Sequence, residues 1–202
     1  MSALPPSPAA PTLCAPDAAL ARPHRGAILL EDASVVAHTQ FAGDQHILRL
    51  HSPRCAARAT AGSFVHLRCI DDLPMRRPLS IMRADATAGW IELLFKVTGA
   101  GTRALAQAQP PQVLSVLGPI GVGFTPHVER PRALAIGGGV GIPPMIFLAE
   151  HLNGDANGSW KPLVLMGSEL PFPFRVRPST ILVPGMPDGV IGCCLLYTSR
   201  CV

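Results

Sequence analysis

Short runs of alternating apolar and polar residues fill the chain from about residue 26 to residue 123, with turn-forming residues between them. Runs of this length and spacing are typical of an antiparallel barrel. We expect six strands, at residues 26–38, 46–50, 63–69, 79–83, 90–97 and 112–117. An Ala/Leu-rich segment at residues 102–108 breaks the alternation and predicts a short helical turn, which ends before Pro110.

The pattern changes after Pro131, where the apolar runs become continuous. Residues 132–136, 161–166 and 180–183 predict buried strands, and residues 145–152 predict a helix. Apolar strands that alternate with a helix or loop indicate a parallel sheet. The expected fold class is therefore a six-stranded antiparallel β-barrel followed by a parallel-sheet α/β domain. We place the two domains at residues 23–128 and 129–192.

The two ends of the chain differ from the rest. Residues 1–22 are rich in Ala and Pro and lack the features of a signal peptide, so we expect a disordered lead-in. Residues 193–202 contain the single tyrosine and Cys193, Cys194 and Cys201. About three parallel strands precede this tail, whereas such a sheet normally needs more. Our hypothesis is that the α/β domain is incomplete and that residues 193–202 are an atypical, non-native tail.

Composition narrows the class of ligand. Of the 202 residues, 15% are charged and 48% hydrophobic, and the net charge of +4 is spread without a dense basic block. A small anionic ligand fits this better than nucleic acid. The 6 cysteines form no CxxC pair, so we expect no metal site and reduced thiols in a cytoplasmic protein. The uncharged residues 133–149 are broken by glycines and prolines, so we expect no membrane span.

The first chemical motif is Arg76-Arg77-Pro78-Leu79-Ser80, at the start of the fourth expected strand. An arginine fork can bind phosphate through two hydrogen bonds, and proline fixes the local backbone. A serine hydroxyl can bond to a ring nitrogen. These residue types suit a flavin dinucleotide, although arginines at a strand start are also common as solvated charges.

Three glycine-rich segments follow: Gly99-Ala100-Gly101-Thr102, Gly118-Pro119-Ile120-Gly121, and the run from Gly137 to Pro144 between a strand and a helix. Glycine lets the backbone approach a phosphate, and a helix start presents free N–H groups. The last segment is not the dinucleotide fingerprint G-x-G-x-x-G, because Pro144 takes the final position. Taken alone, each segment also fits a tight turn or an interdomain connection.

Taken in this order, the four motifs resemble the ferredoxin–NADP reductase superfamily, over about residues 25–192. Within it, the chain most resembles electron-transfer subunits of dihydroorotate dehydrogenases, in its Arg76–Ile81 and Gly-x-Gly-Thr segments. The resemblance implies an FAD-binding barrel and an NAD-binding α/β domain. It also implies a flavoprotein that passes electrons between a catalytic dihydroorotate dehydrogenase subunit and NAD in pyrimidine biosynthesis. Two alternatives stay open: a stand-alone ferredoxin- or flavodoxin-type NAD(P)H reductase, and a non-catalytic FAD-binding regulatory module.

The resemblance further implies roles for individual residues. Arg77 is expected near the FAD diphosphate, and Ser80, as the catalytic residue, near the reactive edge of the ring. The other expected cofactor-binding residues are Pro78, Leu79, Leu94, Phe95, Lys96, Gly101 and Thr102 for FAD, and Gly138, Gly139, Gly141, Ile142, Pro143 and Pro144 for NAD.

Two further points concern the cofactors. Members of the family that carry a 2Fe–2S cluster have closely spaced cysteines near the C-terminus, and this chain lacks that run, so the sequence does not support a cluster. The choice between NAD and NADP stays open. Glu169 follows a strand and can bond ribose hydroxyls, which favours NAD, whereas Arg175 and Arg177 can meet a 2′-phosphate.

Overall fold

The structure is a computed structural model that describes residues 28–70, 73, 75–155, 158, 160 and 162–174. A closed antiparallel barrel contains β1 (Leu29–Phe41), β2 (Gln45–His51), β3 (Phe64–Arg68), β4 (Arg77–Asp85), β5 (Trp90–Lys96) and β6 (Val113–Ile120). Around the barrel the strands follow the order β1–β2–β5–β4–β3–β6. The predicted six-stranded antiparallel barrel is confirmed.

The alternation seen in the sequence builds the barrel core. On β2, Leu48 and Leu50 are fully buried, while Arg49 between them is partly exposed. Val65 and Leu67 repeat this pattern on β3. Successive side chains of a strand point to opposite faces, so one apolar set from every strand meets inside the barrel. This core gives the site a rigid support.

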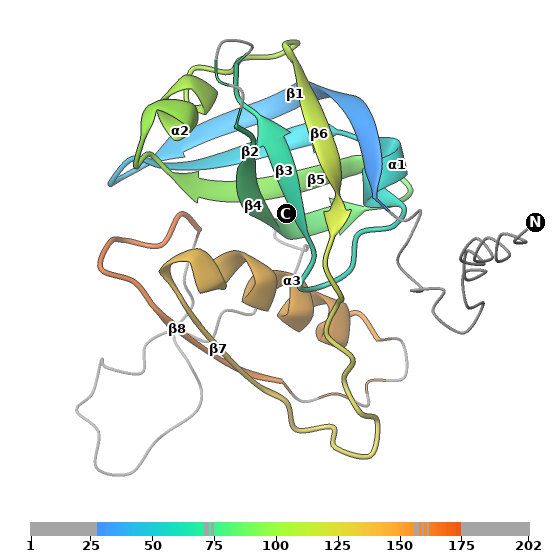
Figure 1. Ribbon diagram of the computed structural model, residues 1–202. Coiled ribbons are helices and arrows are strands. Elements are labelled where there is room, and N and C mark those ends of the chain that lie inside the picture. The colour runs from blue at the N-terminus through green and yellow to red at the C-terminus, as the bar shows by residue number, and fades with distance from the viewer. Residues whose placement is uncertain are drawn as a thin grey trace, which may run out of the picture.

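A smaller layer follows the barrel. It contains β7 (Leu134–Gly138), a 3₁₀ turn η2 (Gly139–Gly141), helix α3 (Ile142–Asn153) and β8 (Leu163–Gly167). β7 and β8 pair in parallel, which confirms the predicted parallel sheet. Figure 1 shows α3 between this sheet and the barrel. Ile142 and Ile146 of α3 pack against Met82 of β4, so the glycine-rich turn before α3 is held beside the barrel.

Several boundaries differ from the sequence-based expectations. Helix α2 (Ala100–Leu105) lies earlier than residues 102–108, because the Thr102 side chain closes the loop in front of it. Helix α3 begins at Ile142 rather than at residue 145, since two prolines fit its first turn. Helix α1 (Pro53–Ala56) was not predicted.

Other expectations lie outside the described residues. These are the lead-in at residues 1–22, the strand at residues 180–183 and the tail at residues 193–202. Over the residues that are described, no helix combines the length and apolar character needed to cross a membrane. In the same part of the chain, no group of three or more His, Cys, Asp or Glu side chains is arranged to hold a metal ion.

Candidate functional site

Arg77 and Gly101 bring two of the predicted motifs together. Arg77 begins β4, and its side chain passes directly over Gly101 in α2. A Cβ atom at position 101 would lie 2.5 Å from the Arg77 Nε atom, so only glycine leaves this space free. Among the described residues, the Arg77 fork makes one hydrogen bond, from Nη1 to the Met75 carbonyl oxygen at 3.2 Å. The remaining guanidinium donors are available to an anion.

The neighbouring arginine has a different task. Arg76 donates from Nη1 to the Ser115 carbonyl oxygen at 2.8 Å and from Nη2 to the Ser115 hydroxyl at 3.0 Å. Nη1 also lies 3.3 Å from the His66 carbonyl oxygen. These bonds fasten the start of β4 to β3 and β6. Of the two arginines, Arg77 is therefore the one free to bind a ligand.

Thr102 shapes the loop that precedes α2. Its hydroxyl oxygen accepts hydrogen bonds from the Thr98 and Gly99 N–H groups at 3.0 and 3.2 Å. It also lies 3.2 Å from the Gly99 carbonyl oxygen, to which it donates. The hydroxyl is thus engaged within the loop. The expected phosphate contact of Thr102 stays a prediction, and what this arrangement supplies is the backbone shape next to Gly101.

Ser80 lies on the outer face of β4. Leu79 and Ile81, on either side of it, pack in or against the barrel core. Alternation along the strand therefore turns Ser80 outward, together with Met82, which contacts α3. In the sheet, Ser80 lies opposite Phe64 of β3. The side of the barrel that presents Ser80 is the side on which α3 packs.

A cleft of about 580 Å³ opens between the end of β5 and the glycine-rich turn before α3. This is within the usual range of roughly 300–1,000 Å³ for small-molecule sites. Its walls bring together six of the predicted residues: Leu94, Phe95, Lys96, Gly139, Ile142 and Pro143. The other predicted residues do not line it. These are Arg77, Pro78, Leu79 and Ser80 on β4, Gly101 and Thr102 on α2, Gly138 on β7, Gly141 in the turn η2 and Pro144 on α3.

Phe95 reaches the cleft from inside the barrel. Its side chain is only 5% exposed, and its ring stacks on His46, with the ring centres 5.2 Å apart. His46 Nδ1 lies 3.0 Å from His38 Nε2, within hydrogen-bonding distance. Burial lowers the pKa of His46, and the neighbouring His38 lowers it further. The cleft therefore has an apolar side chain, that of Phe95, between Leu94 and Lys96. The lowered pKa of His46 favours the uncharged form of the ring that stacks on Phe95.

One wall of the cleft, formed by the residues that follow β8, was not predicted from the sequence. Residues 168–174, here called the return segment, leave β8 and come back to the barrel at the hairpin between β1 and β2 (Figure 1). Gln45 Nε2 donates to the carbonyl oxygens of Pro171 at 2.9 Å and Ala42 at 3.1 Å. Ser168, Glu169 and Leu170 then line the cleft together with Gln45. No hydrophobic period marks this segment, so only the position of Glu169 after a strand pointed to it.

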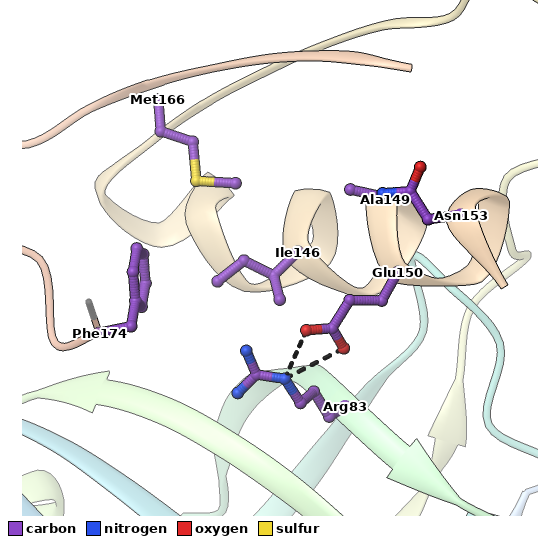
Figure 2. A pocket seen from close by; sticks show the side chains of 7 residues that line it. All are labelled: Arg83, Ile146, Ala149, Glu150, Asn153, Met166 and Phe174. Carbon is purple, nitrogen blue, oxygen red and sulfur yellow. Dashed lines mark hydrogen bonds and ion pairs between the residues drawn. The ribbon is translucent and has the colours of Figure 1, made fainter. Parts of the chain in front are cut away.

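Charged side chains also join α3 to the barrel, nearer the C-terminal end of the helix. Figure 2 shows Arg83 of β4 with its Nε atom 2.8 and 3.0 Å from the two carboxylate oxygens of Glu150 on α3. Arg83 Nη1 also contacts Glu92 at 3.1 Å, and Glu92 pairs with Arg49 at 2.7 Å. Burial alone would lower the pKa of Arg83, but the charges and hydrogen bonds of Glu150 and Glu92 outweigh it and raise that pKa. The small cavity drawn here, about 10 Å³, has room for about one water molecule.

The barrel is similar to a known family of domains. Residues 32–124, which cover most of the barrel, match the family described as "Oxidoreductase FAD-binding domain". This part of the chain is therefore similar to the FAD-binding domains of oxidoreductases.

Its curated relatives include "Dihydroorotate dehydrogenase B (NAD(+)), electron transfer subunit" of Desulforamulus reducens, which is 36% identical over 123 residues, or 60% of this chain and 47% of that protein. The protein of the same description from Listeria monocytogenes is 38% identical over 130 residues, or 63% of this chain and 51% of that protein. The chain spans about half the length of these relatives.

Solved structures agree on the fold. A structure described as the NADH-dependent reduced ferredoxin-NADP oxidoreductase superposes with a TM-score of 0.61 at 25% identity, over 68% of this chain and 48% of that chain. The ferredoxin reductase of carbazole 1,9a-dioxygenase superposes with a TM-score of 0.60 at 22% identity, over 70% of this chain and 43% of that chain. The second likeness concerns the fold alone.

Proposed function

We propose that this chain is the flavin-binding part of an electron-transfer subunit that passes electrons between a dihydroorotate-oxidising partner and NAD. The observation that carries the proposal is the Arg77 fork lying over Gly101, on a barrel whose β5 faces a glycine-rich turn across an open cleft. The relatives at 36% and 38% identity supply the substrate class and the partner. A cytoplasmic location, expected from the cysteine pattern, is part of the proposal.

The residues around Arg77 fit FAD. Any side chain at position 101 would occupy the space in which the Arg77 guanidinium lies. Arg77, at the start of β4, uses only Nη1 in a hydrogen bond among the described residues, so its other donors are available. A diphosphate is an anion that matches an arginine fork. Pro78, Leu79 and Ser80 would then follow the cofactor along β4, and Ser80 would offer its hydroxyl to a polar atom of the ring. FAD, when bound, supplies the redox chemistry, because a flavin accepts electrons as a pair and can return them singly.

The cleft fits the place where FAD and the nicotinamide dinucleotide would meet. Leu94 and Lys96 of β5, which are expected to contact FAD, form one wall, and Gly139 of the turn before α3, which is expected to contact NAD, forms the opposite wall. The N-terminus of α3, a helix of 12 residues, follows this turn, and its free N–H groups favour negatively charged phosphates. In this arrangement the chain would bring NAD and the flavin to the same side of the barrel.

Flavin binding is the direct test of this proposal. The purified chain, reconstituted with FAD, should show bound flavin absorbance, and Arg77→Ala should weaken FAD binding by about tenfold or more, because the diphosphate loses a charge-assisted partner. Arg103→Ala is the matched control: it removes the same charge from the exposed face of α2 and should change the dissociation constant little. A chain that binds no FAD would contradict the proposal.

The identity of the partner needs a second measurement. Co-purification with a dihydroorotate-oxidising subunit in a stable complex supports the electron-transfer subunit. Reduction of ferredoxin or flavodoxin by the isolated flavoprotein, without such a complex, favours the stand-alone reductase. Bound FAD that NADH never reduces favours the regulatory module.

A further inference from the structure

Two histidines on neighbouring strands join the barrel to the chain that follows α2. His46 of β2 lies opposite Phe95 of β5 and is only 3% exposed. Its Nδ1 atom lies 3.0 Å from Nε2 of His38 on β1. His38 Nδ1 lies 2.7 Å from the carbonyl oxygen of Ala108, which is buried just beyond the end of α2. The two rings therefore form a continuous hydrogen-bonded chain from α2 to the ring that stacks on Phe95.

The partners of the two rings determine how many protons the pair can hold. The Ala108 carbonyl oxygen can only accept, so His38 Nδ1 carries a hydrogen. Nε2 of a neutral His38 must then accept, and His46 Nδ1 donates to it. His46 Nε2 is the ring nitrogen of the pair that is left without a hydrogen, so an added proton has its place there. A second added proton would put two hydrogens between the same two nitrogens, so the pair holds one extra proton and no more.

This proton site lies one ring away from the cleft. Phe95 and the next residue of β5, Lys96, both line the cleft, and both are expected to contact FAD. The planes of the His46 and Phe95 rings differ by 11°. A cation over the face of an aromatic ring is attracted to it, so the stack can accept a charged His46. Such a charge would attract a phosphate group in the cleft.

The protein groups around His46 favour its uncharged form. Burial lowers the pKa of His46 most, His38 lowers it further, and Asp44 in the hairpin between β1 and β2 raises it. The ring is therefore mostly neutral at about pH 7. An anion close to the ring would act against burial and raise this pKa.

Charged side chains of the surrounding elements set the background for such an anion. Lys96 of β5 and Glu169 of the return segment line the cleft. Helix α2 carries the exposed Arg103, and Arg77 lies over Gly101 near the start of this helix. A diphosphate next to Arg77 would offset the arginine charges, and a further positive charge on His46 would then meet less repulsion.

We propose that His46 is a proton-dependent part of the cofactor site: it takes up one proton from the solvent on Nε2 when FAD binds, and the charged pair then strengthens the binding of the FAD phosphates. His38 acts as a positioning residue, because its bond to Ala108 fixes which nitrogen of His46 is open to the proton. This inference rests on the proposed binding of FAD and adds a coupled proton to it.

Calorimetry of FAD binding counts the proton. The full 202-residue chain, freed of flavin, is titrated with FAD at about pH 6.5 in two buffers that differ in heat of ionisation. The unmodified chain should take up as much as about one proton per FAD. Its affinity should rise as the pH falls through the range in which the bound form but not the free form of His46 is protonated. A rise of the His46 pKa by about one unit corresponds to about tenfold in affinity.

His46→Phe keeps an aromatic ring on Phe95 but removes the proton site, so proton uptake and this gain in affinity should both be lost. His51→Phe, the same change at an exposed histidine at the end of β2, should leave both as they are. Nitrogen NMR of the unmodified chain gives a readout without a variant, because FAD should move the titration of His46 to higher pH. FAD binding without proton uptake, or uptake that persists in His46→Phe, would overturn this inference alone. A chain that binds no FAD would overturn the proposed function and this inference together.

Discussion

Single residues decide where the anion-binding capacity of the barrel lies. Arg76 and Arg77 are adjacent and chemically identical, yet the bonds of Arg76 to Ser115 make it part of the framework. Arg77 keeps most of its donors free, and it lies over Gly101 of α2, which has no side chain that could occupy the same space. The sequence could predict the pair but not this division, because the bonding partners come from strands far along the chain.

Ser80 allows a test at the scale of one hydroxyl group. It points outward from β4, on the side of the barrel where α3 packs. Ser80→Ala should slow the reduction of bound flavin by NADH by about tenfold, the effect of losing roughly one hydrogen bond, while FAD affinity changes by less than about threefold. Stopped-flow absorbance measures the rate. Ser34→Ala, on β1, is the control, and an unaltered rate in Ser80→Ala would remove this residue from the site.

At the scale of elements, the close approach of α2 to β4 creates the candidate FAD site. Gly101→Ala should keep or slightly raise stability, because alanine favours a helix over glycine by about 0.5–1 kcal/mol. The new Cβ would displace the Arg77 side chain, so FAD binding should weaken by about tenfold if one charge-assisted contact is lost.

Gly99→Ala is the matched control for that change. Gly99 has open space where a Cβ would lie and an extended backbone that any residue adopts, so FAD affinity should stay the same. Flavin fluorescence titration gives the dissociation constants, and thermal unfolding gives the stability. Equal FAD affinity in Gly101→Ala and the unmodified chain would show that the space above Gly101 is not part of the site.

The helices and strands also show which parts of the fold can be predicted from the sequence. All six barrel strands were predicted, because alternation such as that of Leu48 and Leu50 is a local consequence of one buried face. The helix α2 was placed too late, because its start depends on the bonds of Thr102 to the preceding loop. The return segment could not be predicted, since its anchor Gln45 lies 126 residues before Pro171. Contacts at that separation leave no periodic signal.

At the scale of the whole molecule, α3 joins the small parallel sheet to the barrel in two ways. Apolar packing of Ile142 and Ile146 on Met82 lies near the cleft. Farther along the helix, Glu150 binds Arg83, which in turn binds Glu92. The apolar contact supplies attraction without direction. The Arg83 guanidinium fixes orientation, because its Nε binds Glu150 on α3 while its Nη1 binds Glu92 on the barrel. The cleft lies between the two parts, so its width depends on both contacts.

The charged contact yields the last prediction. The Arg83 side chain is 14% exposed, so Arg83→Met should lower the free energy of unfolding by about 2–3 kcal/mol, because it leaves the partly buried Glu150 and one oxygen of the buried Glu92 without their arginine. Arg49→Met removes the other arginine from Glu92, but Arg49 is 38% exposed and Arg83 remains, so the loss should be about 1 kcal/mol or less. Urea unfolding followed by circular dichroism compares the two variants. Equal losses would mean that Arg83 acts as an ordinary surface charge and does not fix α3 on the barrel.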